Sequence, residues 1–366
     1  MAGILLSELV INPQKAFVNM ERYVNNGSPS GFDKKNTTSE LTRPDGIGAH
    51  FPLYSAYVKT HIKITDFGHF PFPLNEREIL LHPDMANVQL VKSNCDQVIK
   101  SDFCVSPIAG ARTVYLEEPL NGFIKLNYNR LIGRIRRQLT QKHVLSSVEL
   151  TSYIVEMLDG GKLCDDFYFF KEPFGRVAVF ETSKRKLKRD WGLVYRESKP
   201  YPYNNNIKYI IPFFSLFGID NRTEQTRTHP SLLSQLIQAQ SKTAGDYLIE
   251  NILEPVLRNY FTILRYGALQ LECHAQNTLL ALDKDFRTCG IIIRDLESVD
   301  KDISLAKDLG MMTEFMSYPY KCIEKNQYNY QIMHSFMFDF KLGEYLIKPC
   351  VNNVCEQNSV DVKNIE

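Results

Sequence analysis

The sequence has few features that would assign it at once to a class of protein. Its eight cysteines include no Cys-x-x-Cys pair, which removes most support for a zinc site or a thioredoxin-like centre. Thiols scattered through 366 residues do not build a dense disulfide framework either, so we expect reduced cysteines in a cytosolic protein. The sequence also shows no internal repeat and no glycine-rich phosphate loop of the Walker or Rossmann type.

An excess of charge of either sign is missing as well. Lys and Arg number 43 and Asp and Glu 42, which leaves a formal net charge of +1. This balance gives no electrostatic argument for a nucleic acid or a charged membrane as partner, and we interpret the basic run at 184–189 as a solvated hairpin tip. No apolar run approaches the length that spans a bilayer, and no basic region precedes the apolar N-terminus. We therefore expect a cytoplasmic protein.

The apolar pattern predicts an α+β fold. Residues 1–46 read as a helix, interrupted by Pro13, and a polar loop. Residues 47–205 form a β-rich part with an antiparallel sheet, 206–350 a helical part, and 351–366 a polar tail. Helical pieces are expected at 130–141 and 146–158 within the β-rich part, and a long helix with an internal Pro255 later. The strand-like runs are 88–91, 113–116, 123–126, 167–170, 177–180 and 193–195.

Without a glycine-rich loop, basic side chains would have to hold the phosphates of any bound nucleotide. Arg112 and Lys125 belong to two neighbouring strand-like runs that could pair as a hairpin and bring both cations to one face. Arg137 is expected on the helix that follows. Three such cations would meet the need of polyphosphate chemistry for positioning and charge neutralisation. Each could equally be a solvated surface cation, because most exposed charges contribute little.

The stretch 266–297 concentrates the most chemistry. Its polar residues are Glu272, His274, Gln276 and Asn277, followed after an apolar run by Arg294, Asp295 and Glu297. A carboxylate at the end of an apolar run needs a cation as partner, and hard oxygen ligands suit Mg²⁺ shared with a nucleotide phosphate. The residues alone leave a second interpretation open, in which the stretch is a pair of edge strands with solvated ends.

Four blocks of the sequence resemble, in the same order along the chain, those of a known family. The family is the siderophore synthetases that work independently of peptide-synthetase modules, the aerobactin-synthetase (IucA/IucC) group. The most specific block is Glu-x-His-x-Gln-Asn, beginning at Glu272, with Arg-Asp-x-Glu following at Arg294. The others are Leu81-His82-Pro83, Gly110-Ala-Arg112-Thr113, and Ile124-Lys125-Leu126 with Ile132-Gly133 and Arg137-x-Leu139. The resemblance spans roughly residues 45–345.

The resemblance implies a function in siderophore biosynthesis and iron acquisition. Such a ligase activates a carboxylic acid, citrate or a derivative, as an acyl-adenylate with ATP and Mg²⁺. An amine or alcohol then captures the acyl group and AMP is released. The implied fold is a cup with β-rich fingers and a helical palm, with ATP between them. The substrates would be small molecules, and a homodimer is one implied assembly, although the sequence leaves the oligomeric state open.

The resemblance also assigns roles to residues of this sequence. It implies that Arg112, Lys125 and Arg137 hold the ATP phosphates and that Arg137 also faces the substrate carboxylate. It implies that His274 and Asn277 contact the phosphate and the reacting carboxylate, so that the catalytic set is Arg137, His274 and Asn277. Asp295 and Glu297 would bind the nucleotide or Mg²⁺, and Glu272 would help to set the metal site.

Several positions depart from the family pattern, and Asp84 and Met85 replace the Trp and Gln that follow His-Pro in the family. Gly110 and Gly133 stand where the family has a phosphate-contacting Ser and Thr, and each lost charge-assisted hydrogen bond costs ~1.5–3 kcal/mol. The chain also looks short at both ends beside a full synthetase. These departures favour a catalytically impaired relative that binds nucleotide or a partner without turnover. We favour the active ligase, because six polar residues keep the family spacing. A third possible function, a ferric-siderophore reductase, would need cysteines gathered for an iron–sulfur cluster, and the scattered cysteines of this sequence do not provide them.

Overall fold

The computed structural model describes residues 3–28, 42–45, 50–132, 135–182, 187–311 and 327–358. The chain divides into two compact units. The helical unit comprises Met1–Gly31, Tyr153–Phe170 and Pro200–Glu366, and the sheet unit comprises Phe32–Ser152 and Lys171–Lys199. This division is not the one expected from the sequence, because the N-terminal helices and Tyr153–Phe170 belong to the helical unit.

The sheet unit contains an eight-stranded sheet in the order β2-β10-β11-β6-β5-β4-β1-β3, and every pair in it is antiparallel. Alternating burial along β1 and apolar clusters around Trp191 and Phe174 explain why these runs form a sheet. The strands are β1 (Phe51–Val58), β2 (Ile64–Gly68), β3 (Glu78–Leu81), β4 (Cys95–Pro107), β5 (Thr113–Leu116), β6 (Gly122–Leu126), β10 (Phe174–Glu181) and β11 (Lys188–Glu197).

Two predictions for this unit were wrong. Residues 88–91 do not form a strand but lead into helix α3 (Gln89–Asn94), since a short apolar run does not distinguish the two structures. The helix expected at 130–141 is replaced by strands β7 (Leu131–Ile132) and β8 (Ile135–Arg136), which pair with each other. The apolar spacing was misleading there, because Leu131 is exposed while Leu139 is buried. Helix α4 begins only afterwards and spans Gln141–Asp159.

The helical unit is built on a four-stranded sheet in the order β12-β14-β15-β9. Strand β9 runs parallel to β15, and the other pairs are antiparallel. The strands are β9 (Phe167–Phe169), β12 (Tyr209–Pro212), β14 (Thr278–Leu282) and β15 (Thr288–Ile293), with a separate pair β13 (Leu269–Gln270) and β16 (Asp300–Lys301). The hairpin β14–β15 contains the apolar run expected between the two polar clusters.

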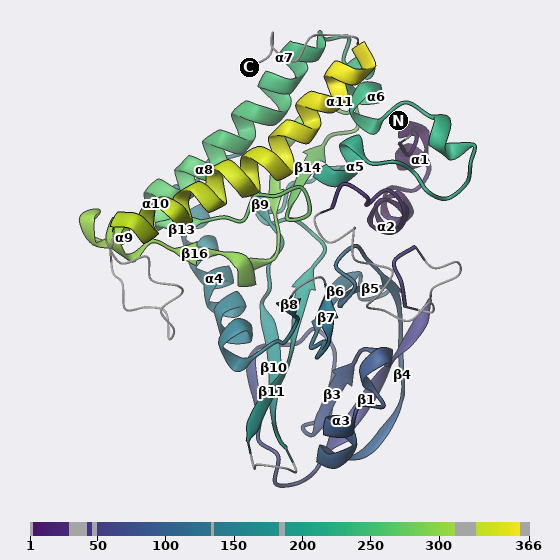
Figure 1. Cartoon of the computed structure of the whole chain (residues 1–366), viewed down its shortest axis with the longest axis vertical. Coiled ribbons are helices and arrows are strands. Elements are labelled where there is room, and N and C mark those ends of the chain that lie inside the picture. The colour runs from purple at the N-terminus through teal and green to yellow at the C-terminus, as the bar shows by residue number, and fades with distance from the viewer. Residues whose placement is uncertain are drawn as a thin grey trace. The chain divides into compact units, whose positions relative to one another are not determined.

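Helices flank this sheet, and two long ones lie side by side (Figure 1). One joins α7 (Ala244–Leu248), a π-helical turn η4 (Ile249–Leu253) and α8 (Glu254–Gly267). The other joins α10 (Gln327–Ser335), a π-helical segment η6 (Phe336–Ile347) and α11 (Lys348–Asn358). The π turn explains how the first helix tolerates its internal proline, because Pro255 lies at the start of α8. The remaining helices are α1 (Leu6–Ile11), α2 (Pro13–Tyr23), α5 (Phe213–Phe217), α6 (Leu232–Ala239) and α9 (Ile303–Asp308).

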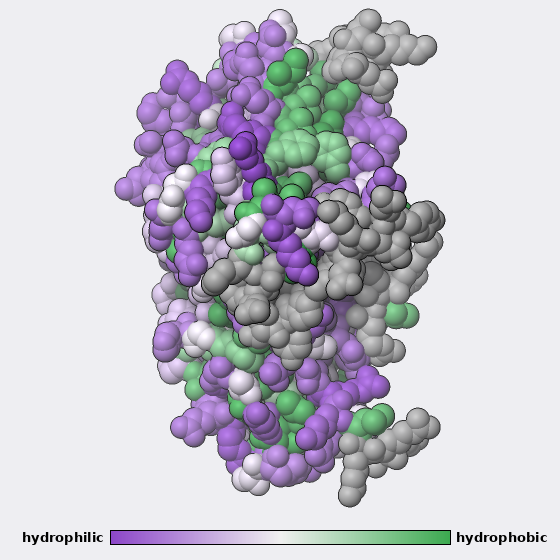
Figure 2. Space-filling view, turned by 90° about the vertical axis from the view of Figure 1, so that its left-hand side faces the viewer, coloured by the Kyte–Doolittle hydropathy of each residue, from purple (hydrophilic) through white to green (hydrophobic). Residues whose placement is uncertain are grey.

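The C-terminal segment is more ordered than its composition suggests. Helix α11 continues to Asn358 and buries Cys350, Val354 and Cys355, where the sequence predicted a polar tail from 351. Large apolar side chains nevertheless remain exposed on the helices of this unit, and Figure 2 shows apolar side chains gathered among hydrophilic ones in the upper half of its view. In the described part of the chain, no helix is both long and apolar enough to cross a bilayer.

Candidate active site

The Glu-x-His-x-Gln-Asn block forms the loop that leads from β13 into β14. Its backbone turns tightly, because His274 N donates to Glu272 O at 2.9 Å and Asn277 N donates to His274 O at 2.9 Å. Ala275 N donates to Tyr345 O of η6 at 3.1 Å, and Ala275 O accepts from Phe214 N at 3.2 Å. The loop is thus fixed on both flanks, which is what a site with accurately placed side chains requires.

The bonding around His274 determines its protonation state. The ring is buried, and its Nδ1 lies 3.2 Å from the backbone nitrogens of both Gln276 and Asn277, which donate to it. Because Nδ1 accepts, the neutral ring carries its proton on Nε2. Burial lowers the pKa of His274, and the nearby Glu272 carboxylate opposes this effect. At neutral pH His274 is therefore an uncharged N–H donor.

Glu272 is held by two partners that fix both of its oxygens. Lys341 Nζ of η6 lies 2.5 Å from Glu272 Oε1, and Asn277 Nδ2 donates to Glu272 Oε2 at 3.4 Å. His274 Nε2 lies 3.8 Å from the same Oε2. Lys341 was missing from the predicted site residues. Nothing in the local sequence marks it, since a single lysine on a distant helix acquires this role only through the tertiary fold.

Two residues of the predicted stretch hold the loop in place rather than facing a ligand. Arg294 is 4% exposed, and its Nη1 pairs with Glu21 Oε1 of α2 at 2.7 Å, where Glu21 is fully buried. Arg294 Nε also donates to Gln276 O at 2.7 Å. The Gln276 side chain accepts from Ser28 Oγ at 3.0 Å. The N-terminal helix α2 is thereby tied to the motif loop and to the end of the β14–β15 hairpin.

Asp295 and Glu297 lie directly after this hairpin. Asp295 has φ 72° and ψ 65°, a left-handed conformation that Asp and Asn adopt more readily than most residues. It occupies the N-cap position of the short 3₁₀ helix Leu296–Ser298 without a capping bond from its side chain, and both Asp295 and Glu297 are half-buried. The Asp295 carboxylate is close enough to act on the pKa of His274, although less than burial does. Over the described ranges, no three His, Cys, Asp or Glu side chains gather as metal ligands.

Lys125 lies on the hairpin that the sequence predicted, and Arg112 directly precedes its first strand. The strand register does not bring the two cations to one face as expected, because Thr113 rather than Arg112 is opposite Lys125. Strands β5 and β6 pair with Thr113 opposite Lys125, and Leu126 N donates to Arg112 O at 3.0 Å. Both cations are buried. The preceding turn brings Arg112 N to within 2.6 Å of Gly110 O, and Ala111 has φ 57°. Arg112 therefore follows a tight, irregular turn.

Arg137 and Gly133 complete the predicted set. The sequence predicted Arg137 on a helix, and this prediction was wrong, because Arg137 follows strand β8. The residue is half-buried. Its backbone closes the β7–β8 hairpin, since Arg137 N donates to Arg130 O at 3.2 Å and Arg137 O accepts from Tyr128 N at 3.0 Å. Gly133 lies outside the described residues. The structure thus gathers Glu272, His274, Asn277 and Asp295 in the helical unit and places Arg112, Lys125 and Arg137 in the sheet unit.

Solved structures show what this arrangement is similar to. ATP-bound aerobactin synthetase IucA from a hypervirulent pathotype of Klebsiella pneumoniae matches with a TM-score of 0.69 at 15% identity, over 98% of this chain and 70% of that one. The petrobactin biosynthesis protein AsbB from Bacillus anthracis str. Sterne matches with a TM-score of 0.64 at 13% identity, over 93% and 60%. The chain has the fold of the siderophore synthetases. Aerobactin synthetase IucC from the same Klebsiella pathotype also matches, with a TM-score of 0.59 at 12% identity, over 84% and 58%.

The siderophore-synthetase fold is shown by structure rather than by sequence. Neither a family model nor a curated protein matches this chain. The mixed α+β architecture with its large antiparallel sheet confirms the predicted fold class. At identities of 12–15%, fold similarity survives mainly through the pattern of buried residues, so the activity has to be argued from the site itself.

Proposed function

We propose that this protein is an ATP-dependent ligase of the siderophore-synthetase type. It activates a carboxylic acid, citrate or a derivative, as an acyl-adenylate and transfers the acyl group to an amine or alcohol. The observation that carries the proposal is the buried ring of His274, which is neutral because burial lowers its pKa. Its Nε2 lies 3.8 Å from Glu272 Oε2, which accepts from Asn277 Nδ2, while the other Glu272 oxygen pairs with Lys341. This constellation of fixed donors lies on the synthetase fold.

The proposed reaction proceeds in two steps. A substrate carboxylate oxygen attacks the α-phosphorus of ATP, and the bond to pyrophosphate breaks. The amine or alcohol then attacks the acyl carbon, loses a proton, and AMP leaves. Such chemistry depends on positioning and charge neutralisation, because the protein forms no covalent bond. His274 Nε2–H would donate to an anionic oxygen of the carboxylate or phosphate, and Asn277 would support it.

The cations and carboxylates would divide the remaining work. Arg112, Lys125 and Arg137 would bind the phosphates, with Arg offering a bidentate fork. When bound, Mg²⁺ neutralises phosphate charge as a Lewis acid. A nucleotide-bound Mg²⁺ keeps water and phosphate ligands and needs only one or two carboxylates, which fits the absence of a larger acidic cluster among the described residues. We assign this role to Asp295 and Glu297, since the charge of Glu272 is already matched by Lys341.

A second candidate function is a relative that binds nucleotide or a partner without turnover. Gly110 supports this alternative, because it provides no hydroxyl and its carbonyl accepts a bond from Arg112 N within the chain. The loss of one phosphate contact would slow the reaction rather than abolish it, since each such bond is worth ~1.5–3 kcal/mol. The intact His274 cluster therefore favours the ligase.

Turnover can be tested with the full chain, ATP and Mg²⁺, a panel of citrate-like acids, and hydroxylamine or a polyamine as acceptor. We expect release of AMP and pyrophosphate that depends on the acid. Asn277→Ala should lose most of this activity, whereas Asn206→Ala, a matched change at an exposed position, should not. Nucleotide binding without turnover across the panel would favour the impaired relative. Failure to bind nucleotide would contradict the ligase and would leave only a relative that binds a partner.

A further inference from the structure

The α10–η6 helix contacts the segment that leads from β13 into the motif loop at successive points. The contacts follow the same direction along both segments and join His334 to Gln270, Lys341 to Glu272, and Tyr345 to Ala275. The second and third contacts belong to the candidate site, and the first lies just before it. A displacement of the helix at the first contact would therefore be passed on to the other two.

The first contact is a cluster of polar groups. His334 Nε2 lies 2.8 Å from Asp302 Oδ2, and Asp302 is fully buried. Gln270 is fully buried as well, and its Nε2 lies 2.8 Å from His334 Nδ1 and 2.7 Å from His334 Nε2. Because the carboxylate accepts from Nε2, the Gln270 amide donates to Nδ1 of the neutral ring. Both ring nitrogens are thereby fixed. We call His334, Asp302 and Gln270 the anchor cluster.

Asp302 is itself held by the backbone around it. Its Oδ1 accepts from Leu305 N at 2.8 Å and caps helix α9, and its own N donates to Ala268 O at 2.7 Å, directly before β13. A buried carboxylate is costly unless its oxygens are bonded, so Asp302 has little freedom to move. The anchor cluster consequently gives His334 one position relative to β13.

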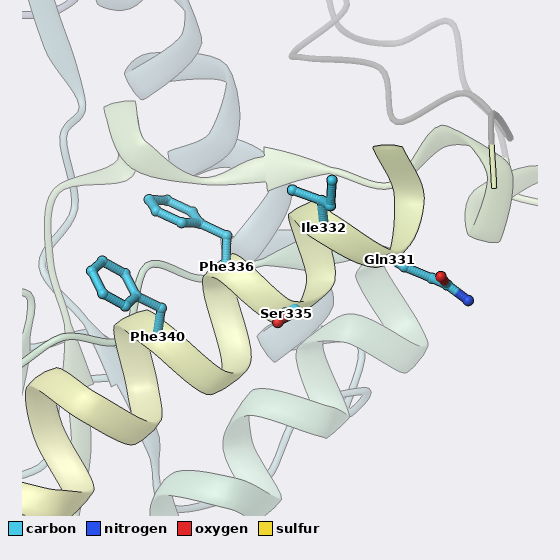
Figure 3. A pocket seen from close by; sticks show the side chains of 5 residues that line it. All are labelled: Gln331, Ile332, Ser335, Phe336 and Phe340. Carbon is cyan, nitrogen blue, oxygen red and sulfur yellow. The ribbon is translucent and has the colours of Figure 1, made fainter. Parts of the chain in front are cut away.

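The direction of Lys341 depends on how its helix is placed. Its Nζ lies 5.0 Å from the centroid of the Phe336 ring and 2.5 Å from Glu272 Oε1. Phe336 in turn stacks on Phe340, with centroids 5.5 Å apart, and Figure 3 shows both rings on the same side of the helix. The ammonium group is thus placed between a ring of its own helix and the carboxylate of the motif loop. A rotation of the helix would move it away from Glu272.

The π-helical form of η6 makes this placement sensitive to the contacts at its ends. A π helix closes its hydrogen bonds one residue later than an α helix, so successive side chains turn by a different angle. Lys341 lies within η6, whereas His334 lies just before it and Tyr345 near its end. The contacts of these two residues therefore decide where Lys341 points.

We propose that His334 is a positioning residue for the reaction, because the anchor cluster fixes the α10–η6 helix against β13 so that Lys341 reaches Glu272. This inference rests on the proposed function and deepens it. Without the ring, the helix would be released at its first contact and Lys341 could leave Glu272. An unpaired Glu272 carboxylate would then repel the anionic acid and the phosphate that the site has to bring together.

Amide hydrogen exchange followed by NMR tests the inference without any turnover. The amide of Ala275 donates to Tyr345 O, so its exchange rate reports whether the helix still meets the motif loop. We expect His334→Ala to accelerate this exchange about tenfold or more, since the lost contact includes a hydrogen bond to a charged group. The amides of β14 should exchange as in wild type. Equal acceleration in β14 would mean a general loss of stability and would overturn the positioning role.

Asp302→Asn is a second variant, chosen because asparagine also caps helices and so keeps the start of α9 intact. Removing the charge weakens the bond to His334, and we expect the same selective effect on Ala275 at a smaller size. Gln331→Ala is the matched control, because Gln331 is exposed on the same helix and Figure 3 shows it pointing away from the stacked rings. Wild-type exchange at Ala275 in both anchor-cluster variants would overturn the inference.

Turnover provides the second readout. With ATP, Mg²⁺ and the panel of acids, His334→Ala should lower kcat about tenfold and leave the KM for ATP unchanged. Adding Lys341→Met should cause no further loss beyond that of Lys341→Met alone, because His334 acts through Lys341. Additive losses would overturn this route.

The two readouts separate the inference from the proposed function. If wild type releases no AMP while the exchange of Ala275 responds selectively, His334 positions the helix and the ligase assignment fails. If wild type turns over and the exchange of Ala275 does not respond, the ligase assignment survives and His334 is not a positioning residue.

Discussion

At the scale of single residues, the chemistry of the candidate site depends on which atom of a side chain is already in use. His274 Nδ1 accepts hydrogen bonds from two backbone amides, so only Nε2–H remains for a ligand. One carboxylate oxygen of Glu272 pairs with Lys341, and the other accepts a hydrogen bond from Asn277. The loop therefore presents donors where a bare list of Glu, His and Asn would suggest a general base or a metal site.

Lys341 should control the charge state of His274. It opposes the Glu272 carboxylate, so removing its ammonium group leaves that charge to act on the ring alone. We expect the pKa of His274 to rise in Lys341→Met and to return towards that of wild type in Lys341→Arg, and activity near neutral pH to fall about tenfold in the methionine variant. An NMR titration of the imidazole measures this directly. An unchanged titration in Lys341→Met would contradict the role of Lys341.

His82 of the sheet unit should make the protein sensitive to acid. The ring is fully buried, and burial lowers its pKa from 6.5 to about 4. Between these values the unfolded chain binds more protons than the folded one, so stability is lost as the pH falls from 6.5 towards 4. At 1.36 kcal/mol for each pKa unit, the loss amounts to roughly 3 kcal/mol.

The matched variant is His82→Asn, whose Oδ1 can still accept the bond that Nδ1 takes from Asp84 N at 3.2 Å. Denaturant unfolding at several pH values should show a flatter decline for the variant than for wild type. Taking the difference between the two curves removes contributions from other groups, including His274. Parallel curves would show that His82 is not the responsible group.

At the scale of elements, the sequence was a good guide at several places where the pattern is local, although not at 88–91. Strand β5 has the predicted bounds, and the interruption at Pro13 separates α1 from α2. The prediction failed where neighbours in space decide, as at 130–141, where Leu131 and Leu139 share a helical spacing but not an environment. Burial in a sheet depends on partner strands from distant sequence, and single-sequence periodicity does not contain that information.

The contact between α2 and the β14–β15 hairpin was equally invisible in the sequence. Glu21 is one of several charged residues on an amphipathic helix, and nothing there distinguishes a buried partner of Arg294 from a solvated carboxylate. The pair also shows what Arg294 of the motif block does in this fold. Its guanidinium pairs with Glu21 and donates to the Gln276 carbonyl, so its role is to position the loop.

Breaking this pair should destabilise the helical unit. Glu21→Ala leaves the buried Arg294 guanidinium without its carboxylate, which typically costs about 3–5 kcal/mol. The double change Glu21→Leu with Arg294→Met removes both charges and should cost less than the single change. Chemical denaturation of the three proteins tests the prediction. A loss below about 1 kcal/mol for Glu21→Ala would mean that the pair is solvated and unimportant.

At the scale of the whole molecule, the chain separates two chemical tasks between its two units. Under the proposed function, the buried cations of the sheet unit would bind phosphate, and the donors and carboxylates of the helical unit would serve the carboxylic acid and Mg²⁺. The motif spacing predicted both sets of residues. The sequence could not show that the N-terminal helices belong with the distant motif, or that a lysine of η6 completes it, because both depend on how the helical unit packs.

On this proposal, nucleotide binding should depend on residues of each unit. The effect of Mg²⁺ on ATP affinity should depend on Asp295 of the helical unit. Arg137→Ala removes a cation that we propose binds phosphate, and it should weaken ATP binding about tenfold or more with or without Mg²⁺. Asp295→Asn keeps the left-handed backbone, which asparagine also adopts, but removes the charge that would reach the metal. Calorimetric titrations with Mg²⁺ and with a chelator should show a large magnesium effect in wild type and a small one in Asp295→Asn. If both variants bind ATP with wild-type affinity and the same magnesium dependence, neither Arg137 nor Asp295 belongs to a nucleotide site.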